Sequence, residues 1–179
     1  QNAGIPKVDG LDKEYAFRWS YGIGETMTFI LPNYKGGVSG AAALDQEGKT
    51  VEALQEAQLP SDAANYFFGR MSAYWGDQPF TSGPVYFGVF ICLLFVAGLF
   101  IVRNWHIGWL VAASILGIVL AWGHHFKAIN YFLFDYLPIY NKFRAPSMAM
   151  VIPQLTFCVL ASMTLQSILY DDWDKKLLW

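Results

Sequence analysis

The sequence predicts an α-helical integral membrane protein with about three transmembrane helices and a long region outside the bilayer. Three apolar segments, at residues 84–102, 106–123 and 148–170, are each long enough to cross about 30 Å of hydrocarbon. The composition agrees, because 55% of the residues are hydrophobic and only 15% are charged, against about a quarter charged in an ordinary soluble protein. Core helices of a large soluble protein are the alternative, but such helices seldom stay uncharged over this length.

The region 1–83 is too rich in glycine, proline and polar residues to enter the membrane, so we expect it at one membrane face. Within it, Thr26 to Leu31 (TMTFIL) is expected to be a short β-prone or interfacial stretch, and Asn33 to Gly37 is a turn signal. Residues 47–59 have helical periodicity, and a second short helix is expected after Ser61. The many aromatic residues of this region indicate a loop folded onto the bilayer or onto the helices.

The first two apolar segments are predicted to cross the membrane as a pair joined by a tight turn. No charged residue occurs in 85–102, and the second segment, 106–123, is equally uncharged. Trp109 and Trp122 lie near the ends of the second segment, as expected of the aromatic residues that gather at a bilayer interface. Cys92 is interpreted as a small apolar packing residue.

The third apolar segment, 148–170, carries Pro153 and Gln154. A transmembrane helix tolerates proline where its neighbours satisfy the freed carbonyl, so this span is expected to pack against other helices. Cys158 is interpreted as a packing residue and not as part of a disulfide or metal site. Residues 171–179 are expected to be a tail or the start of the next loop, and both ends of the sequence suggest an internal fragment of a larger polytopic protein.

The segment 124–147 joins the second span to the third and is expected at the same membrane face as the region 1–83. Its stretch from Phe132 to Pro138 is apolar and aromatic but too short to span, which predicts a short helix along the interface. Pro146 disfavours helix at Ala145, so the backbone just before the third span is expected to be extended.

Lys142 and Arg144 are candidate phosphate-binding residues at the start of the third span. Arginine offers a planar fork that binds phosphate oxygens bidentately, and lysine adds a point charge. Two residues apart, they would share one side of an extended segment. The alternative is simple contact with anionic lipid headgroups, worth about 1 kcal/mol for each cation.

His124 and His125 follow the second span at the same face and are candidates for phosphate hydrogen bonds or for interfacial caps. Adjacent residues at a helix end point about 100° apart, which suits them poorly to chelating one metal ion. No cluster of cysteine or histidine elsewhere supports a metal site.

Glu25, in the sequence GIGET (residues 22–26), is the carboxylate most suggestive of function in the long region. Flanking glycines let the backbone approach another group closely, and a carboxylate there can act as a base, a sugar ligand or a metal ligand. A solvated loop residue is the alternative interpretation. Asp77 and Asp135 are weaker candidates at the same face.

Three blocks resemble, in order and spacing, the YfhO family of bacterial membrane proteins in the form found in Bacteroidetes. They are GLDKEYAFRWSYGIGETMTFILPNYKGG (10–37), YWGDQPFTSGPVYFG (74–88) and DYLPIYNKFRAPS (135–147). The resemblance extends over nearly the whole chain, although members of the family are considerably longer. They are thought to share the GT-C fold of integral-membrane glycosyltransferases, which implies that this chain is a fragment of a polytopic GT-C-like helix bundle.

The resemblance implies transfer of a sugar from a polyprenyl-phosphate donor to a cell-envelope glycan or lipid acceptor, at the outer face of the bacterial cytoplasmic membrane. It implies that 1–83 and 124–147 are external (periplasmic) and that 171–179 is cytoplasmic, an orientation that the positive-inside rule alone leaves tied. The donor phosphate would then be bound by Lys142, Arg144, His124 and His125.

Such a reaction needs a carboxylate to accept the proton of the acceptor, and cations or a divalent metal ion to balance charge on the leaving phosphate. In GT-C enzymes the catalytic acid lies in the first external loop after the first membrane helix; that loop is not recognised here, so no catalytic base is assigned. Expected partners are membrane lipids, the donor and the remaining transmembrane helices of the full-length protein, and no basic patch indicates nucleic acid. The main alternative is a non-enzymatic scaffold or transporter segment, although a transport pathway would place charges inside the spans.

Overall fold

The computed structural model describes residues 10–39, 49–57, 60, 62–63, 66, 72–81, 83, 85–103 and 105–170. Every regular element in these ranges is a helix, and the extended pairing found there is an isolated bridge between Gly36 and Tyr74. The expected α-helical class is therefore confirmed for this part of the chain. The α-helices are α1 Lys13–Ala16, α2 Lys49–Glu56, α4 Val89–Ile101, α5 His106–Ala121, α6 Lys127–Tyr136 and α7 Val151–Tyr170, and the 3-10 helices are Gly24–Phe29, Gly123–Phe126, Tyr140–Lys142 and Pro146–Met150.

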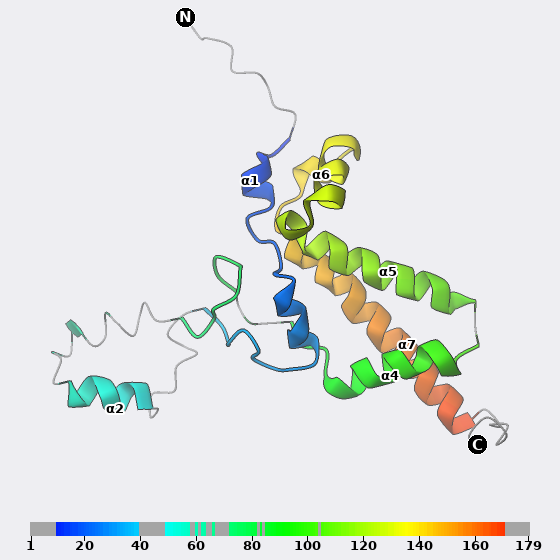
Figure 1. Cartoon of the computed structure of the whole chain (residues 1–179), viewed down its shortest axis with the longest axis horizontal. Coiled ribbons are helices and arrows are strands. Elements are labelled where there is room, and N and C mark those ends of the chain that lie inside the picture. Colours follow the sequence, from blue (N-terminus) through cyan, green and yellow to red (C-terminus); the bar gives the residue numbers. More distant parts are fainter. Residues whose placement is uncertain are drawn as a thin grey trace, which may run out of the picture.

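Three apolar helices form the body of the structure, with α7 lying between α4 and α5 (Figure 1). Glycine permits the close approach on both sides of α7. A side chain at Gly98 of α4 would overlap Thr164, and a Cβ at Gly117 of α5 would lie 2.6 Å from Cδ of Pro153. The expectation that the proline-containing span packs against other helices is thus met, with Pro153 itself buried against α5.

Aromatic rings join the long N-terminal region to these helices. The rings of Phe29 and Phe87 stack with their centroids 4.0 Å apart, Phe87 meets Phe157 of α7 edge-on at 5.0 Å, and Phe157 stacks on Phe95 of α4 at 3.8 Å. Offset and edge-on ring pairs are each favourable beyond the area that they bury. The 3-10 helix Gly24–Phe29 is therefore fixed to the end of the helix bundle.

One helix in the described residues, Pro146–Tyr170, is by itself long and apolar enough to cross a membrane. The second apolar helix, α5, meets the same test only together with the segment Gly123–Tyr136, from which it is bent by 109°. The first, α4, is apolar but has only 13 residues. The length and apolar character of the third predicted span are confirmed, and membrane crossing by the first two stays a prediction.

Both of the first two helices are shorter than the apolar segments that predicted them. The helix α4 begins at Val89, after Gly88, which has a φ of 99° and donates its N–H to the carbonyl of Phe29 at 3.2 Å. The helix α5 ends at Ala121, and Gly123, with a φ of 47°, turns the chain into the next element. Hydropathy did not reveal these ends because apolar residues continue past both of them.

Of the two alternatives for Thr26 to Leu31, the β-prone stretch is wrong, because Gly24–Phe29 is a 3-10 helix, and an interfacial position stays a prediction. The hydroxyl of Thr28 donates to the carbonyl of Glu25 at 2.6 Å, which closes a turn that β-propensity does not take into account. The turn signal at Asn33 to Gly37 is confirmed, since Asn33 has a φ of 58° and Gly36 a φ of 81°. The helix expected over 47–59 is found as α2, and most of the helix expected after Ser61 lies outside the described residues.

The segment 124–147 contains the helix expected near its middle, although α6 starts earlier than predicted, at Lys127, and ends before Pro138. Before the third span the backbone is extended at Phe143. Lys142 belongs to a 3-10 helix, and Ala145 is left-handed, with a φ of 59°. Lys142 and Arg144 therefore do not share one side of an extended strand, as the sequence had predicted.

Candidate functional site

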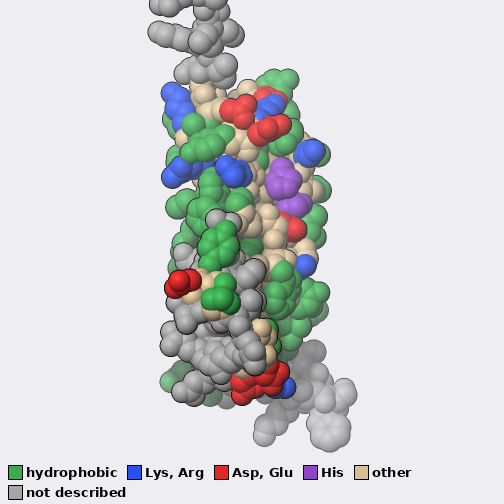
Figure 2. Space-filling view, turned by 90° about the vertical axis from the view of Figure 1, so that its left-hand side faces the viewer, with side chains coloured by type: hydrophobic (Ala, Val, Ile, Leu, Met, Phe, Trp, Pro, Cys, Tyr) green, Lys and Arg blue, Asp and Glu red, His purple; other side chains and the backbone are tan. Residues whose placement is uncertain are grey.

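Most of the lysine and arginine side chains drawn in Figure 2, and the histidines, lie in the upper half of that face. Arg144 lines a cavity of about 360 Å³ next to the start of α7. Apart from Arg144, the residues that line it are almost entirely apolar. The larger side chains that line the cavity are Phe17, Phe134, Tyr140, Phe143, Pro146 and Met148.

The cavity is formed where the N-terminal segment crosses the segment before α7. The amide of Ala145 donates to the carbonyl of Ala16 at 3.2 Å, and that of Ser147 donates to the carbonyl of Trp19 at 3.1 Å. Lys13 forms an ion pair with Asp135 of α6 at 2.7 Å. Two stretches more than a hundred residues apart in the chain thus provide opposite walls of the cavity.

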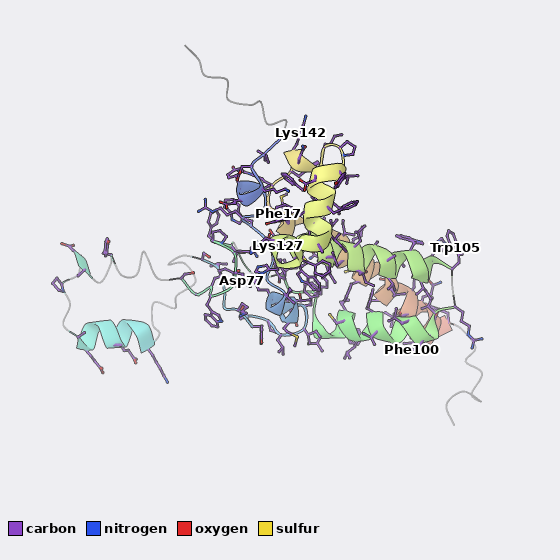
Figure 3. The ribbon with its side chains drawn as sticks, turned by 45° about the horizontal axis from the view of Figure 1, so that its top comes forward. Phe17, Asp77, Phe100, Trp105, Lys127 and Lys142 are labelled. Carbon is purple, nitrogen blue, oxygen red and sulfur yellow. The ribbon has the colours of Figure 1, made fainter. Side chains whose placement is uncertain are left out.

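The two predicted phosphate-binding cations have different surroundings. Arg144 donates from Nη1 to the hydroxyl of Tyr15 at 2.6 Å, which uses one of the five donors of its guanidinium. Lys142 does not line the cavity, and in Figure 3 it lies at the outer end of this region, with Phe17 and Lys127 between it and Asp77. Among the described residues, Arg144 is the cation that a ligand in this cavity would meet.

His124 and His125 lie side by side, with ring centroids 4.0 Å apart, but they contact different parts of the protein. Nδ1 of His124 is 3.2 Å from the carbonyl of Phe17, so this ring supports the cavity wall from behind. Nε2 of His125 points toward Asp77, 3.9 Å from Oδ2, and is buried without a hydrogen-bond partner in the described structure. The two rings therefore lie against each other and do not point about 100° apart, as the sequence had predicted, although their nitrogens meet different groups.

Burial lowers the pKa of His125, and the neighbouring His124 lowers it further, whereas the carboxylates of Asp77 and Glu25 act in the opposite direction. Burial has the larger effect, because the charged imidazolium loses more stabilisation from water than the nearby carboxylates give back. His125 is therefore held as a neutral imidazole near neutral pH. Its buried Nε2 faces a carboxylate that is about half exposed to solvent, with 49% of the Asp77 side chain accessible.

Glu25 is fully enclosed, with 1% of its surface exposed, and its carboxylate accepts hydrogen bonds from four donors. Oε1 accepts from the hydroxyl of Tyr74 and from the amide of Asp77, the latter at 2.6 Å. Oε2 accepts from the amide of Gly22 and from Nε2 of Gln78, both at 3.4 Å. A buried carboxylate whose two oxygens both accept hydrogen bonds is suited to a structural role.

Two glycines leave the space for this carboxylate. A Cβ at Gly22 would overlap the carboxylate of Asp77, and a Cβ at Gly76 would overlap both Oε1 of Glu25 and the hydroxyl of Tyr74. The close approach expected beside Glu25 is therefore real. Burial and the bond to Glu25 raise the pKa of Tyr74, which keeps its hydroxyl protonated as a donor.

Sequence reasoning missed the partners of Glu25. Tyr74 and Gln78 lie 49 and 53 residues further along the chain, and no local pattern connects them to the glycine-containing loop. In their block, YWGDQ, the sequence indicated Asp77 as a weaker candidate, but nothing in it connected the block with Glu25. The structure gives it a physical role, because Glu25 and this block together hold Asp77 beside His125.

The described residues do not by themselves form a complete protein site for a divalent metal ion. They contain no group of three His, Cys, Asp or Glu side chains arranged to hold one. Glu25 is already saturated by donors, and the dyad of His125 and Asp77 supplies only two ligands. Comparison of the chain with protein-family models, curated proteins and solved structures gives no match.

Proposed function

We propose that this chain binds a lipid-linked phosphate at the membrane interface and belongs to a GT-C-like glycosyltransferase that uses a polyprenyl-phosphate sugar as donor. The observation that carries the proposal is the presence of Arg144 among the otherwise apolar residues that line a cavity of about 360 Å³. An amphiphile with an anionic head matches this pairing, because the guanidinium binds phosphate oxygens and the aromatic walls accept a hydrocarbon chain.

The position of the cavity supports the same ligand. Pro146 and Met148 line it and also begin Pro146–Tyr170, the helix that is long and apolar enough to span a membrane. A lipid whose tail lies in the outer leaflet would therefore reach the cavity without leaving the interface. With the external orientation implied by the YfhO resemblance, the site faces the outside of the cytoplasmic membrane of a bacterium, in a multi-pass protein.

In the proposed reaction, Arg144 balances the charge that grows on the departing phosphate as the sugar is transferred. The acceptor hydroxyl must also lose a proton, and we assign this role to Asp77, which lies outside the residues that line the cavity. Asp77 is half exposed, fixed through its own amide by Glu25, and faced by the neutral imidazole of His125. Glu25 does not contact the substrate in this proposal; it positions Asp77 by accepting a hydrogen bond from the amide of that residue.

The test is transfer of radiolabelled sugar from a polyprenyl-phosphate donor by the purified full-length protein. Arg144→Ala is expected to abolish transfer, and Asp77→Asn is expected to lower kcat with little change in KM for the donor. Arg103→Ala is the matched control, because Arg103 lies in the turn between α4 and α5, at the opposite end of α5 from the cavity. Unchanged transfer in Arg144→Ala would contradict the phosphate site.

A non-catalytic scaffold is the second candidate, and the state of Glu25 favours it. The carboxylate singled out by the sequence is enclosed and joins two loops, as a purely structural residue would. A scaffold predicts no sugar transfer by the purified protein, with or without Asp77. Transfer that depends on Asp77 would exclude this alternative.

A further inference from the structure

The guanidinium of Arg144 is held by a side chain that lies outside the cavity. Nη1 of Arg144 donates a hydrogen bond to the hydroxyl oxygen of Tyr15 at 2.6 Å, and Tyr15 does not line the cavity. Both side chains are exposed, Tyr15 to 40%. Because many contacts between exposed side chains contribute nothing measurable, the backbone around these two residues decides whether the contact is a fixed one.

The backbone brings Tyr15 and Arg144 together. The residues that follow them in the chain are joined by a hydrogen bond of 3.2 Å, from the amide of Ala145 to the carbonyl of Ala16. Ala145 is left-handed, with a φ of 59°, a conformation that a residue with a side chain keeps only where its surroundings hold it. The amide of Tyr15 donates to Oδ1 of Asp12 at 3.1 Å. The main chain therefore sets the position of Tyr15 relative to Arg144.

This hydrogen bond leaves the edge of the guanidinium that suits a phosphate open. A guanidinium has five N–H donors, and the edge formed by Nε and Nη2 presents two parallel donors to the oxygens of one phosphate. Tyr15 accepts from Nη1, which lies outside this edge. Among the described residues, no acceptor is bonded to Nε or Nη2 of Arg144. Tyr15 thus holds one corner of the guanidinium without competing with the ligand.

We propose that Tyr15 is a positioning residue for phosphate binding, which fixes the guanidinium of Arg144 before the ligand arrives. An exposed arginine side chain has many rotamers, and holding it in the bound conformation removes part of the cost of ordering it during binding. Tyr15 acts through Arg144 and does not itself contact the lipid. This role rests on the proposed phosphate site, but it can fail while that site stands.

Removing the hydroxyl alone tests this role. The Kd values of the full-length protein in lipid nanodiscs are measured for a polyprenyl phosphate and for the matching polyprenol, in the wild type and in Tyr15→Phe. We expect the variant to bind the phosphate about two- to tenfold more weakly, the usual effect of one hydrogen bond, and to bind the alcohol as the wild type does. Tyr34→Phe is the matched control and should change neither Kd, because Tyr34 is similarly exposed, at 46%, and does not line the cavity.

A double-mutant cycle separates positioning from direct contact with the ligand. In an Arg144→Gln background, Tyr15→Phe is expected to have no further effect on the Kd for the phosphate. A further loss in that background would show that Tyr15 binds the ligand itself, and equal weakening of phosphate and alcohol would show a structural role. Either result overturns the proposal, as does an unchanged phosphate Kd in Tyr15→Phe.

The same measurements separate failure of this role from failure of the phosphate site. A wild-type protein with no preference for the phosphate over the alcohol contradicts the proposed function, and the role of Tyr15 falls with it. A preference that Arg144→Gln removes and Tyr15→Phe leaves intact contradicts the role of Tyr15 alone.

Discussion

At the scale of single residues, the enclosed carboxylate of Glu25 is the feature that organises the polar end of the molecule. Burying a carboxylate is costly unless hydrogen bonds replace the lost water, and here both oxygens are engaged. The sequence indicated Glu25 through its flanking glycines. It could not indicate Tyr74 or Gln78, because a contact across about fifty residues leaves no periodic or local signal.

The hydrogen bonds around Glu25 predict that adding one methyl group at Gly76 lowers the stability of the protein. Gly76→Ala places a Cβ where Oε1 of Glu25 and the hydroxyl of Tyr74 now meet, so the short contacts of the carboxylate must open. We expect a loss of about 1–3 kcal/mol in the free energy of unfolding, measured by denaturant titration in detergent. Gly24→Ala is the control, since a Cβ at Gly24 meets only Cε of Lys35, at 3.9 Å.

His125 predicts a loss of stability in mild acid. Its pKa in the folded protein is below the ordinary value of 6.5, so between these two values the unfolded chain binds more protons than the folded chain. The free energy of unfolding should therefore fall as the pH drops below about 6.5 and level off below the folded pKa. His125→Gln should flatten the pH dependence of the free energy of unfolding, and a slope equal to that of the wild type would contradict this prediction. The control is His106→Gln, at the far end of α5, which should keep the pH dependence of the wild type.

At the scale of secondary structure elements, apolar runs predicted the helices and glycines decided how they end and pack. Hydropathy located α4, α5 and α7, but it extended α4 over residues 85–88, where Gly88 and a bond to Phe29 hold the chain out of helix. The β-propensity of its residues indicated a β-prone stretch at Thr26 to Leu31, where the hydroxyl of Thr28 instead closes a 3-10 turn. Both errors arise from tertiary or side-chain hydrogen bonds that a residue scale does not contain.

Close packing of α5 on α7 gives an element-scale prediction. Gly117→Leu would force α5 away from Pro153 and Ile152, and it would strain the 2.6 Å hydrogen bond between Ser114 and Thr156. We expect destabilisation of about 2–4 kcal/mol, because overpacking and a lost polar contact act together. Gly108→Leu, in the same helix with nothing within 4 Å of its Cβ, should be neutral, and equal effects of the two variants would contradict the α5–α7 contact.

At the scale of the whole molecule, the chain brings its first described residues onto the segment before its last helix. This arrangement creates the cavity beside Arg144, and it could not be predicted because the walls come from three separate parts of the chain, residues 16–17, Leu120 and residues 134–149. The sequence did predict that Arg144 lies at the start of a membrane-length helix. It paired Arg144 with Lys142, whereas the structure places Arg144 with aromatic side chains and the hydroxyl of Tyr15.

The pairing of one cation with an apolar cavity predicts a ligand that is both anionic and lipid-like. Charge-assisted hydrogen bonds to a guanidinium are worth about 1.5–3 kcal/mol, which corresponds to roughly a tenfold to hundredfold difference in affinity. The apolar walls should bind the lipid chain with or without the phosphate. A neutral lipid alcohol of the same chain length is therefore the informative comparison.

The most direct measurement is the Kd of the full-length protein, in lipid nanodiscs, for a polyprenyl phosphate and for the matching polyprenol. The phosphate is expected to bind at least about tenfold more tightly than the alcohol, and Arg144→Gln should remove that difference while Arg103→Gln keeps it. Equal affinity for the phosphate and the alcohol in the wild type, or a phosphate preference that survives Arg144→Gln, would contradict a lipid-phosphate site at Arg144.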